Sequence, residues 1–224
     1  MMKLYGVPGW GSAISEMMLT LANIPYQFIN VDGFDQPGAQ REKLLAINPL
    51  CQVPTLLLAD GSVMTESAAI ALMILDERPD LAPPAGTPQR RQFQRLLIWL
   101  VANVYPTFTY ADYPERWTAS APDELRESCQ QYRKSLYLWL EQQLAAAPYA
   151  LGGDITLLDC YIAAMYSWGP RRECSRRIRQ SLPPWRRRFI AVRNCSRYCV
   201  TTIFFKALIV TCIRKPVIVL NSQE

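Results

Sequence analysis

Hydroxyl and carboxyl side chains stand at the starts of two helical patterns, where they could bind an anion. Ser12 opens a run of apolar residues at three- and four-residue spacing, and its hydroxyl is predicted to cap that helix. Glu66 and Ser67 open another such run. The free amides and the dipole of a helix start attract a carboxylate or another anion. The alternative is that these side chains only cap their helices.

Val53-Pro54 stands just before a predicted strand and is a candidate cis peptide bond. Only X-Pro bonds adopt the cis form at low cost, and a cis turn exposes the backbone of the residue before the proline. The alternative is an ordinary trans proline at the start of a strand. The first interpretation predicts a backbone binding surface at Val53.

The absence of histidine excludes Ser-His-Asp and Cys-His catalysis and every metal site that needs imidazole. The seven cysteines include no C-x-x-C pair, so no metal and no redox motif is expected. Their odd number, with no signal-peptide pattern, favours a reducing cytosol. The longest apolar run, residues 198–213, is interrupted by Lys206 and is short for a bilayer span. A cytoplasmic protein with no membrane partner is expected.

Residues 1–78 are predicted to form an α/β domain. The expected elements are strands at residues 2–7, 26–31, 54–58 and 62–64, and helices at residues 12–22, 41–47 and 66–75. Asp60-Gly61 lies at the turn between the last two strands, which predicts a hairpin. The order βαβα followed by ββα indicates a mixed sheet with one crossover.

Residues 89–173 are predicted to form a separate all-α domain, because residues 78–89 are rich in proline and read as a linker. The expected helices cover residues 93–104, 125–144 and 156–168, the first of them running into Pro106. Thr156-x-x-Asp159 is a capping-box pattern at the start of the third helix.

Three segments and this capping box together resemble the cytosolic glutathione transferases, above all bacterial transferase-like members. The segments are LYGVPGWGS at residues 4–12, NPLCQVPTL at residues 48–56 and TESAAI at residues 65–70. They are similar, in order and spacing, to the first-strand loop, the N-P-x-G-x-V-P-x-L segment and the E-S-x-A-I segment of that family. The resemblance covers residues 2–173. It implies a thioredoxin-like domain, an all-α domain and a homodimer.

The resemblance also implies a site for glutathione as cosubstrate. The backbone of Val53 would pair with the cysteinyl part of glutathione as an added strand, within the loop that Gln52 and Pro54 complete. Ser67 would bind the γ-glutamyl carboxylate, and Glu66 would bind the ammonium group.

Ser12 is the candidate for stabilising the glutathione thiolate, which is the nucleophile in this chemistry. Tyr5 and the absence of any side-chain catalyst are the alternatives. Gly11 stands where beta-class members carry cysteine, so mixed-disulfide chemistry is not expected there.

Trp10, Tyr105 and Phe108 are candidates for the pocket of the electrophilic substrate, with core or dimer packing as the alternative. Cys51 replaces the usual glycine of the second segment. It is interpreted as a small buried residue rather than as a thiol open to glutathionylation.

Residues 174–224 depart from the family pattern. Residues 1–173 carry 13 Lys+Arg and 18 Asp+Glu, a net charge of −5, whereas the tail carries 11 Lys+Arg and one Glu, a net charge of +10. We interpret this basic tail as a frame artefact, that is, an altered reading frame. The alternative is that Arg186–Arg188 bind nucleic acid or an acidic membrane, but a nucleic-acid partner is not expected.

The sequence therefore favours a glutathione-dependent transferase that conjugates or reduces electrophilic or peroxide substrates. A transferase-like protein without catalysis, acting through protein contacts, is the alternative, because Gly11 carries no thiol and the tail replaces the last helices of the family.

Overall fold

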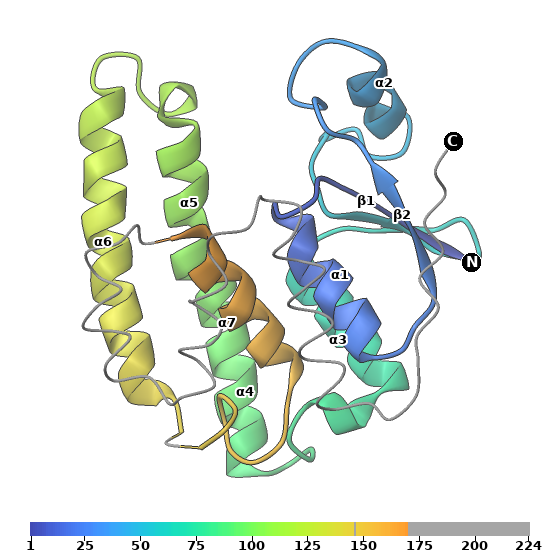
Figure 1. Cartoon of the computed structure of the whole chain (residues 1–224), viewed down its shortest axis with the longest axis vertical. Helices are drawn as coiled ribbons and strands as arrows, with labels where there is room; N and C mark the ends of the chain where they lie inside the picture. The colour runs from blue at the N-terminus through green and yellow to red at the C-terminus, as the bar shows by residue number, and fades with distance from the viewer. Residues whose placement is uncertain (146, 170–224) are drawn as a thin grey trace. The chain divides into compact units, whose positions relative to one another are not determined.

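The computed structural model describes residues 1–145 and 147–169, and these divide into two compact units (Figure 1). The first unit is Met1–Pro79 and the second begins at Asp80. The predicted basic tail, residues 174–224, lies outside the described residues.

The first unit contains a four-stranded mixed sheet. Its elements are β1 (Met2–Gly6), α1 (Ser12–Leu21), β2 (Tyr26–Asn30), α2 (Ala39–Leu45), β3 (Thr55–Leu57), β4 (Val63–Met64) and α3 (Ser67–Glu77). The strand order is β2-β1-β3-β4, with β2 parallel to β1, β3 antiparallel to β1, and β4 antiparallel to β3. The predicted order of strands and helices is confirmed.

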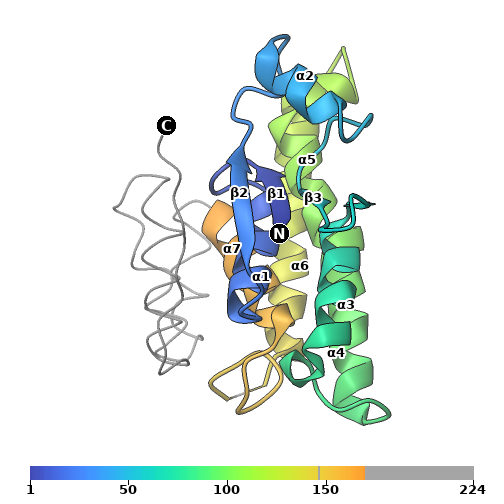
Figure 2. The same cartoon turned by 90° about the vertical axis from the view of Figure 1, so that its right-hand side faces the viewer.

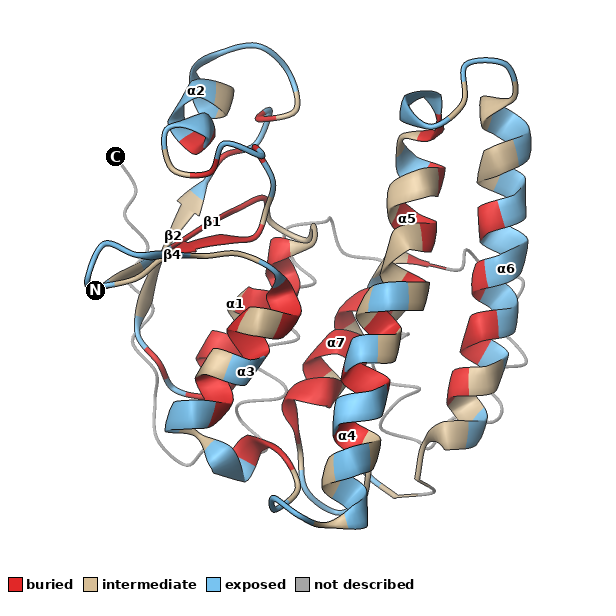
Figure 3. Ribbon diagram, turned by 180° about the vertical axis from the view of Figure 1, so that it is seen from behind, coloured by how far each residue is buried: buried red, intermediate tan, exposed pale blue. Residues whose placement is uncertain are grey.

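Helices α1 and α3 pack against each other and carry much of the core of this unit (Figure 3). Nine of the ten residues of α1 are buried, including the polar Ser12, Ser15 and Thr20. The other buried cluster centres on Val31, Phe34 and Leu44, and Tyr5 and Cys51 belong to it. Tyr5 is 7% exposed. It therefore packs inward.

The second unit is helical in the described residues. After the short 3₁₀ turn η1 (Pro79–Leu81), it contains α4 (Pro88–Trp99), the π-helical segment η2 (Leu100–Val104), α5 (Tyr105–Asp112), η3 (Pro114–Arg116), α6 (Pro122–Gln143) and α7 (Leu157–Trp168). Figure 2 shows α4 and α5 as successive parts of one long rod. Helix α5 packs against α6, and α4 packs against α7.

The predicted end of the first helix at Pro106 is wrong, because the helix continues through the proline. Proline has no N–H to donate. The helix widens to a π-turn in η2, where the Tyr105 N–H bonds to the Leu100 C=O, and Pro106 then falls in the first turn of α5. Pro106 therefore costs this continuous helix one backbone hydrogen bond without ending it.

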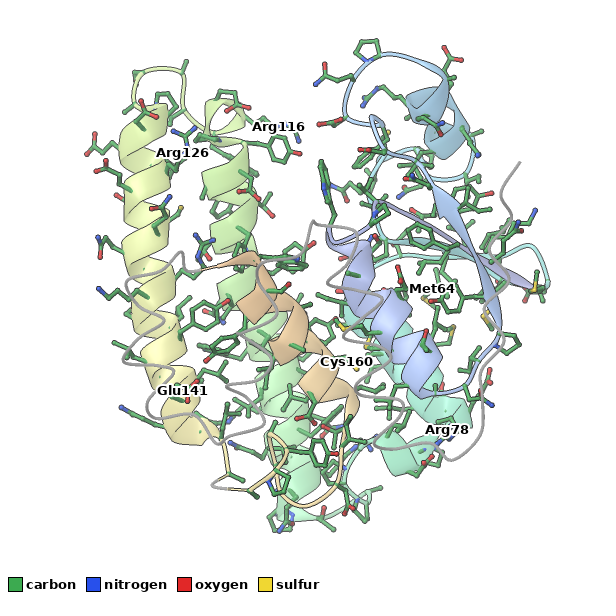
Figure 4. The ribbon with its side chains drawn as sticks, viewed as in Figure 1. Met64, Arg78, Arg116, Arg126, Glu141 and Cys160 are labelled. Atoms are coloured by element: carbon green, nitrogen blue, oxygen red, sulfur yellow. The ribbon has the colours of Figure 1, made fainter. Side chains whose placement is uncertain are left out.

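Two tyrosine hydroxyls fix α7 to α6. Tyr137 donates to the Met165 C=O at 3.0 Å, and Tyr166 donates to the carboxylate of Glu141, which Figure 4 labels on α6. At the start of α7 the predicted capping box is confirmed. One oxygen of Asp159 accepts from the Thr156 N–H and hydroxyl, each at 2.9 Å, and the other accepts from the Ala150 N–H at 2.8 Å.

No helix among the described residues is long and apolar enough to span a membrane.

Candidate functional site

Strand register brings the three predicted site segments to one end of the sheet. Tyr5, near the end of β1, pairs with Thr55, the first residue of β3, so Val53 lies beside the loop that follows β1. Met64, the last residue of β4, pairs with Leu56 (Figure 4). The start of α3 therefore follows at the same end.

Ser12 is wholly buried, and its hydroxyl binds within its own loop. It donates to the Val7 C=O at 3.0 Å and accepts from the Val7 N–H at 3.0 Å. Gly6 makes room for it, because a Cβ on Gly6 would lie 2.3 Å from both Cβ and Oγ of Ser12. The side chain thus closes the turn between β1 and α1.

Ser12 does not cap α1 as predicted. The cap position is Gly11, and no side chain bonds to the first amides of the helix. Ser12 is the first helical residue, and its hydroxyl already has both partners on Val7. Within the described part of the chain the N–H groups of Gly11 and Ser12 have no acceptor. The start of α1 therefore offers backbone donors to an anion.

The loop before β3 presents the backbone of Val53. The Val53-Pro54 bond is cis, as predicted. Among the described residues neither the N–H nor the C=O of Val53 has a hydrogen-bond partner. Pro54 is buried and Gln52 is exposed beside them. An extended ligand can therefore pair with Val53 as an added strand.

Cys51 has φ +50°, in the left-handed region where glycine is favoured. Cys51 is 8% exposed, and its thiol lies 3.8 Å from the Phe34 C=O, to which it donates. The interpretation of Cys51 as a small buried residue is confirmed.

The start of α3 carries a hydroxyl and uncapped amides. Glu66 is exposed and has φ +59°, which is uncommon for a residue with a side chain. No side chain caps α3. Ser67 is 9% exposed, and its hydroxyl has no partner in the part of the chain that the structure describes. Unused donors at a helix start suit a carboxylate.

The three candidate pocket aromatics are divided between the two units. Trp10 stacks edge-on against Phe34 in the first unit, with ring centroids 6.1 Å apart. Tyr105 and Phe108 both contact the Trp168 ring in the second unit, at 5.7 and 5.4 Å. Phe108 is 7% exposed.

Phe108 also carries a buried cation on its ring. The guanidinium carbon of Arg133 lies 4.0 Å from the ring centroid, and Arg133 donates to the Thr107 C=O at 3.4 Å. Burial lowers the pKa of Arg133. Phe108 is thus a core residue of the helical unit.

The cysteines of the described residues are all free and buried. Burial raises the pKa of the Cys160 thiol, which Figure 4 labels on α7, and that of Cys129. A protonated, buried thiol is a poor nucleophile. The same residues contain no group of His, Cys, Asp or Glu that could hold a metal ion.

The sheet order, the cis-proline loop and the helix start after β4 define a transferase-type N-terminal domain. The family model described as "Glutathione S-transferase, N-terminal domain" matches residues 14–78. The chain belongs to the glutathione S-transferase family, with a thioredoxin-like domain followed by a helical domain.

Relatives and solved structures agree with this assignment. The chain is 65% identical over 173 residues to the uncharacterized GST-like protein YncG of Escherichia coli K12, an alignment that covers 77% of this chain and 84% of that protein. It is 25% identical to glutathione S-transferase GstA of Escherichia coli O157:H7, with 75% and 82% covered. The beta-class glutathione S-transferase of Sphingomonas chungbukensis superposes with a TM-score of 0.69 at 25% identity, covering 92% of this chain and 98% of that one.

Asn48 and Thr55 were not predicted to take part in the site. Both are buried polar residues at the ends of the cis-proline loop. Their polar residue types at the two ends of the N-P-x-x-x-V-P-T segment are visible in the sequence, but their contact with each other is not.

Proposed function

We propose that this protein binds glutathione and uses its thiolate to conjugate or reduce electrophilic or peroxide substrates. The observation that carries the proposal is the set of unused hydrogen-bonding groups at one end of the sheet. Val53 offers a backbone N–H and C=O, and Ser67 offers a hydroxyl at an uncapped helix start, each without a partner among the described residues. Buried or half-buried polar groups are normally paired, so these groups suit a ligand.

In this proposal glutathione lies along the end of the sheet where the three predicted site segments meet. Its cysteinyl backbone pairs with Val53, in the loop completed by Gln52 and Pro54. Its γ-glutamyl carboxylate accepts from Ser67, and its ammonium group meets the exposed carboxylate of Glu66. Family membership supports this orientation.

The thiolate is then placed at the start of α1, where Ser12 stabilises it. Two groups of Ser12 could do so. The hydroxyl must leave the Val7 C=O before it can donate to sulfur, and it is wholly buried. The backbone N–H of Ser12, with that of Gly11, needs no such rearrangement. The helix dipole favours the anion at the same point.

The acceptor pocket and the assembly belong to the same proposal. Trp10, Tyr105 and Phe108 are the aromatic candidates for contacts with a small electrophile. Of these, Phe108 has the weakest claim, because it is buried under Arg133 and Trp168. A homodimer and a cytoplasmic location are typical of the family and complete the proposal.

Glutathione affinity of a Ser67→Ala variant tests the binding site. Losing a hydrogen bond to a charged carboxylate costs about 1.5–3 kcal/mol, so affinity should fall roughly ten- to a hundredfold by calorimetry. Ser62→Ala is the matched control, because its hydroxyl bonds to Asp60 in the exposed hairpin turn. Equal glutathione affinity in wild type and Ser67→Ala, with both folded, would remove the assignment.

A transferase-like protein without catalysis is the second candidate. The observation in its favour is the commitment of the Ser12 hydroxyl to Val7. The two functions differ in one result: the second predicts glutathione binding without turnover of any general electrophile or peroxide.

A further inference from the structure

A buried hydrogen-bond network holds the loop that carries Val53. Asn48 is 4% exposed and Thr55 is wholly buried. The side-chain amide of Asn48 donates to the Gln52 C=O at 3.2 Å and to the Thr55 hydroxyl at 2.9 Å. The Thr55 hydroxyl donates to the same Gln52 C=O at 2.7 Å. Two side chains thus converge on one carbonyl.

Every polar hydrogen of the Asn48 and Thr55 side chains has an acceptor, so this network is complete. The Asn48 amide has two N–H groups, and each has its own acceptor. Thr55 has one hydroxyl hydrogen, which goes to Gln52, so its oxygen is free to accept from Asn48. The Asn48 carbonyl oxygen accepts from the Leu50 N–H at 3.1 Å. A fully satisfied buried network fixes one conformation.

The fixed carbonyl belongs to the same peptide group as the Val53 N–H. A peptide group is planar, and in the trans form its C=O and N–H point in opposite directions. The only cis bond in the described chain is the next one, Val53-Pro54. Because the Gln52 C=O is held inward by Asn48 and Thr55, the Val53 N–H must point outward, away from them.

We propose that Asn48 and Thr55 are positioning residues that aim the Val53 N–H at the cysteinyl carbonyl of glutathione. This inference rests on the proposed function. The two side chains act through the Gln52–Val53 peptide and need not touch the ligand. They also explain why the Val53 amide has no partner within its loop.

Replacing Thr55 tests this role with little change of shape. Thr55→Val removes the hydroxyl, so Gln52 loses one donor and Asn48 loses one acceptor. Glutathione affinity should fall about tenfold, the effect of one lost hydrogen bond. Thr55→Ser keeps a hydroxyl and should restore most of the affinity. Thr20→Val is the matched control, since it removes a buried hydroxyl that bonds to Tyr26 at the far end of α1.

The NMR chemical shift of the Val53 amide proton supplies a second measurement, which general destabilisation of the fold would not change. On adding glutathione, this proton should shift downfield in the wild type and in Thr55→Ser, and less in Thr55→Val. Equal affinity and equal shifts in wild type and Thr55→Val would overturn the positioning role and leave the proposed function standing. Loss of affinity in Thr20→Val as large as in Thr55→Val would also overturn it. A wild type that does not bind glutathione would overturn both proposals.

Discussion

Removing the Ser12 hydroxyl separates two roles that the sequence could not distinguish. One is to close the turn between β1 and α1, and the other is to stabilise the thiolate of glutathione. In Ser12→Ala the Val7 N–H loses its acceptor, whereas the Val7 C=O keeps the Trp10 N–H at 3.0 Å. Val7 is 3% exposed, so water cannot easily replace the lost partner. Leaving one buried donor unsatisfied costs about 1–3 kcal/mol of unfolding free energy.

The effect on the thiolate follows from comparing hydrogen-bond energies. A bond from the Ser12 hydroxyl to the thiolate would contribute about 1.5–3 kcal/mol. To make it, the hydroxyl must give up the Val7 C=O, worth about 1 kcal/mol, and risk the Val7 N–H as well. The gain and the loss nearly cancel. The hydroxyl is also wholly buried, so it would have to move before it could contact the thiolate. We therefore expect the backbone amides to hold the thiolate and Ser12→Ala to leave the thiol pKa unchanged.

Two measurements on Ser12→Ala check this reasoning. Denaturant unfolding should show the loss of stability, and a pH titration of thiolate absorbance with bound glutathione should match the wild type. Thr20→Val serves as a comparably destabilised control. A rise of the thiol pKa by about one to two units, with turnover near pH 7 reduced roughly ten- to a hundredfold and less at high pH, would refute the amide assignment. The hydroxyl would then be the donor.

Two further predictions concern stability. Burial raises the pKa of Glu16 from 4.5 to about 7. The folded protein should therefore lose up to about 3 kcal/mol of stability as pH rises from about 4.5 through 7. Glu16→Gln should flatten this pH dependence, measured by unfolding curves at pH 5.5 and 8, and should be more stable than the wild type at pH 8. Asp159→Ala removes three hydrogen bonds at the start of α7 and should cost about 3 kcal/mol by the same method, with a smaller loss in Asp159→Asn, which keeps one acceptor oxygen.

Features whose signals are local could be predicted from the sequence. The capping box needs only Thr156 and Asp159 at the right spacing, and both bond as expected. The cis bond before Pro54 could be predicted for the same reason, because its signal is the local X-Pro pair. The order of strands and helices followed from runs of apolar residues between turn signals.

Features that depend on competition between partners could not be predicted. Pro106 signals a helix end by itself, but the helix widens to a π-turn over Leu100–Val104, just before the proline, and continues. Ser12 at a helix start suggests a cap, but the missing side chain of Gly6 lets its hydroxyl reach Val7 instead. The roles of Asn48 and Thr55 appear only when the loop between them is closed.

The parts of the candidate site at Val53 and at the start of α1 consist of backbone groups, and this explains how the side chains of Gly11 and Cys51 can depart from the family pattern. Cys51 replaces a glycine in the left-handed region, at a cost of about 1–2 kcal/mol that burial of its side chain offsets. Gly11 replaces the cysteine of beta-class members, and a backbone N–H remains there. Neither exchange changes the donors and acceptors offered by Val53. Gly11 has no sulfur and Cys51 is buried, so neither position supplies an accessible thiol; in the proposed function the nucleophile is the thiolate of glutathione itself.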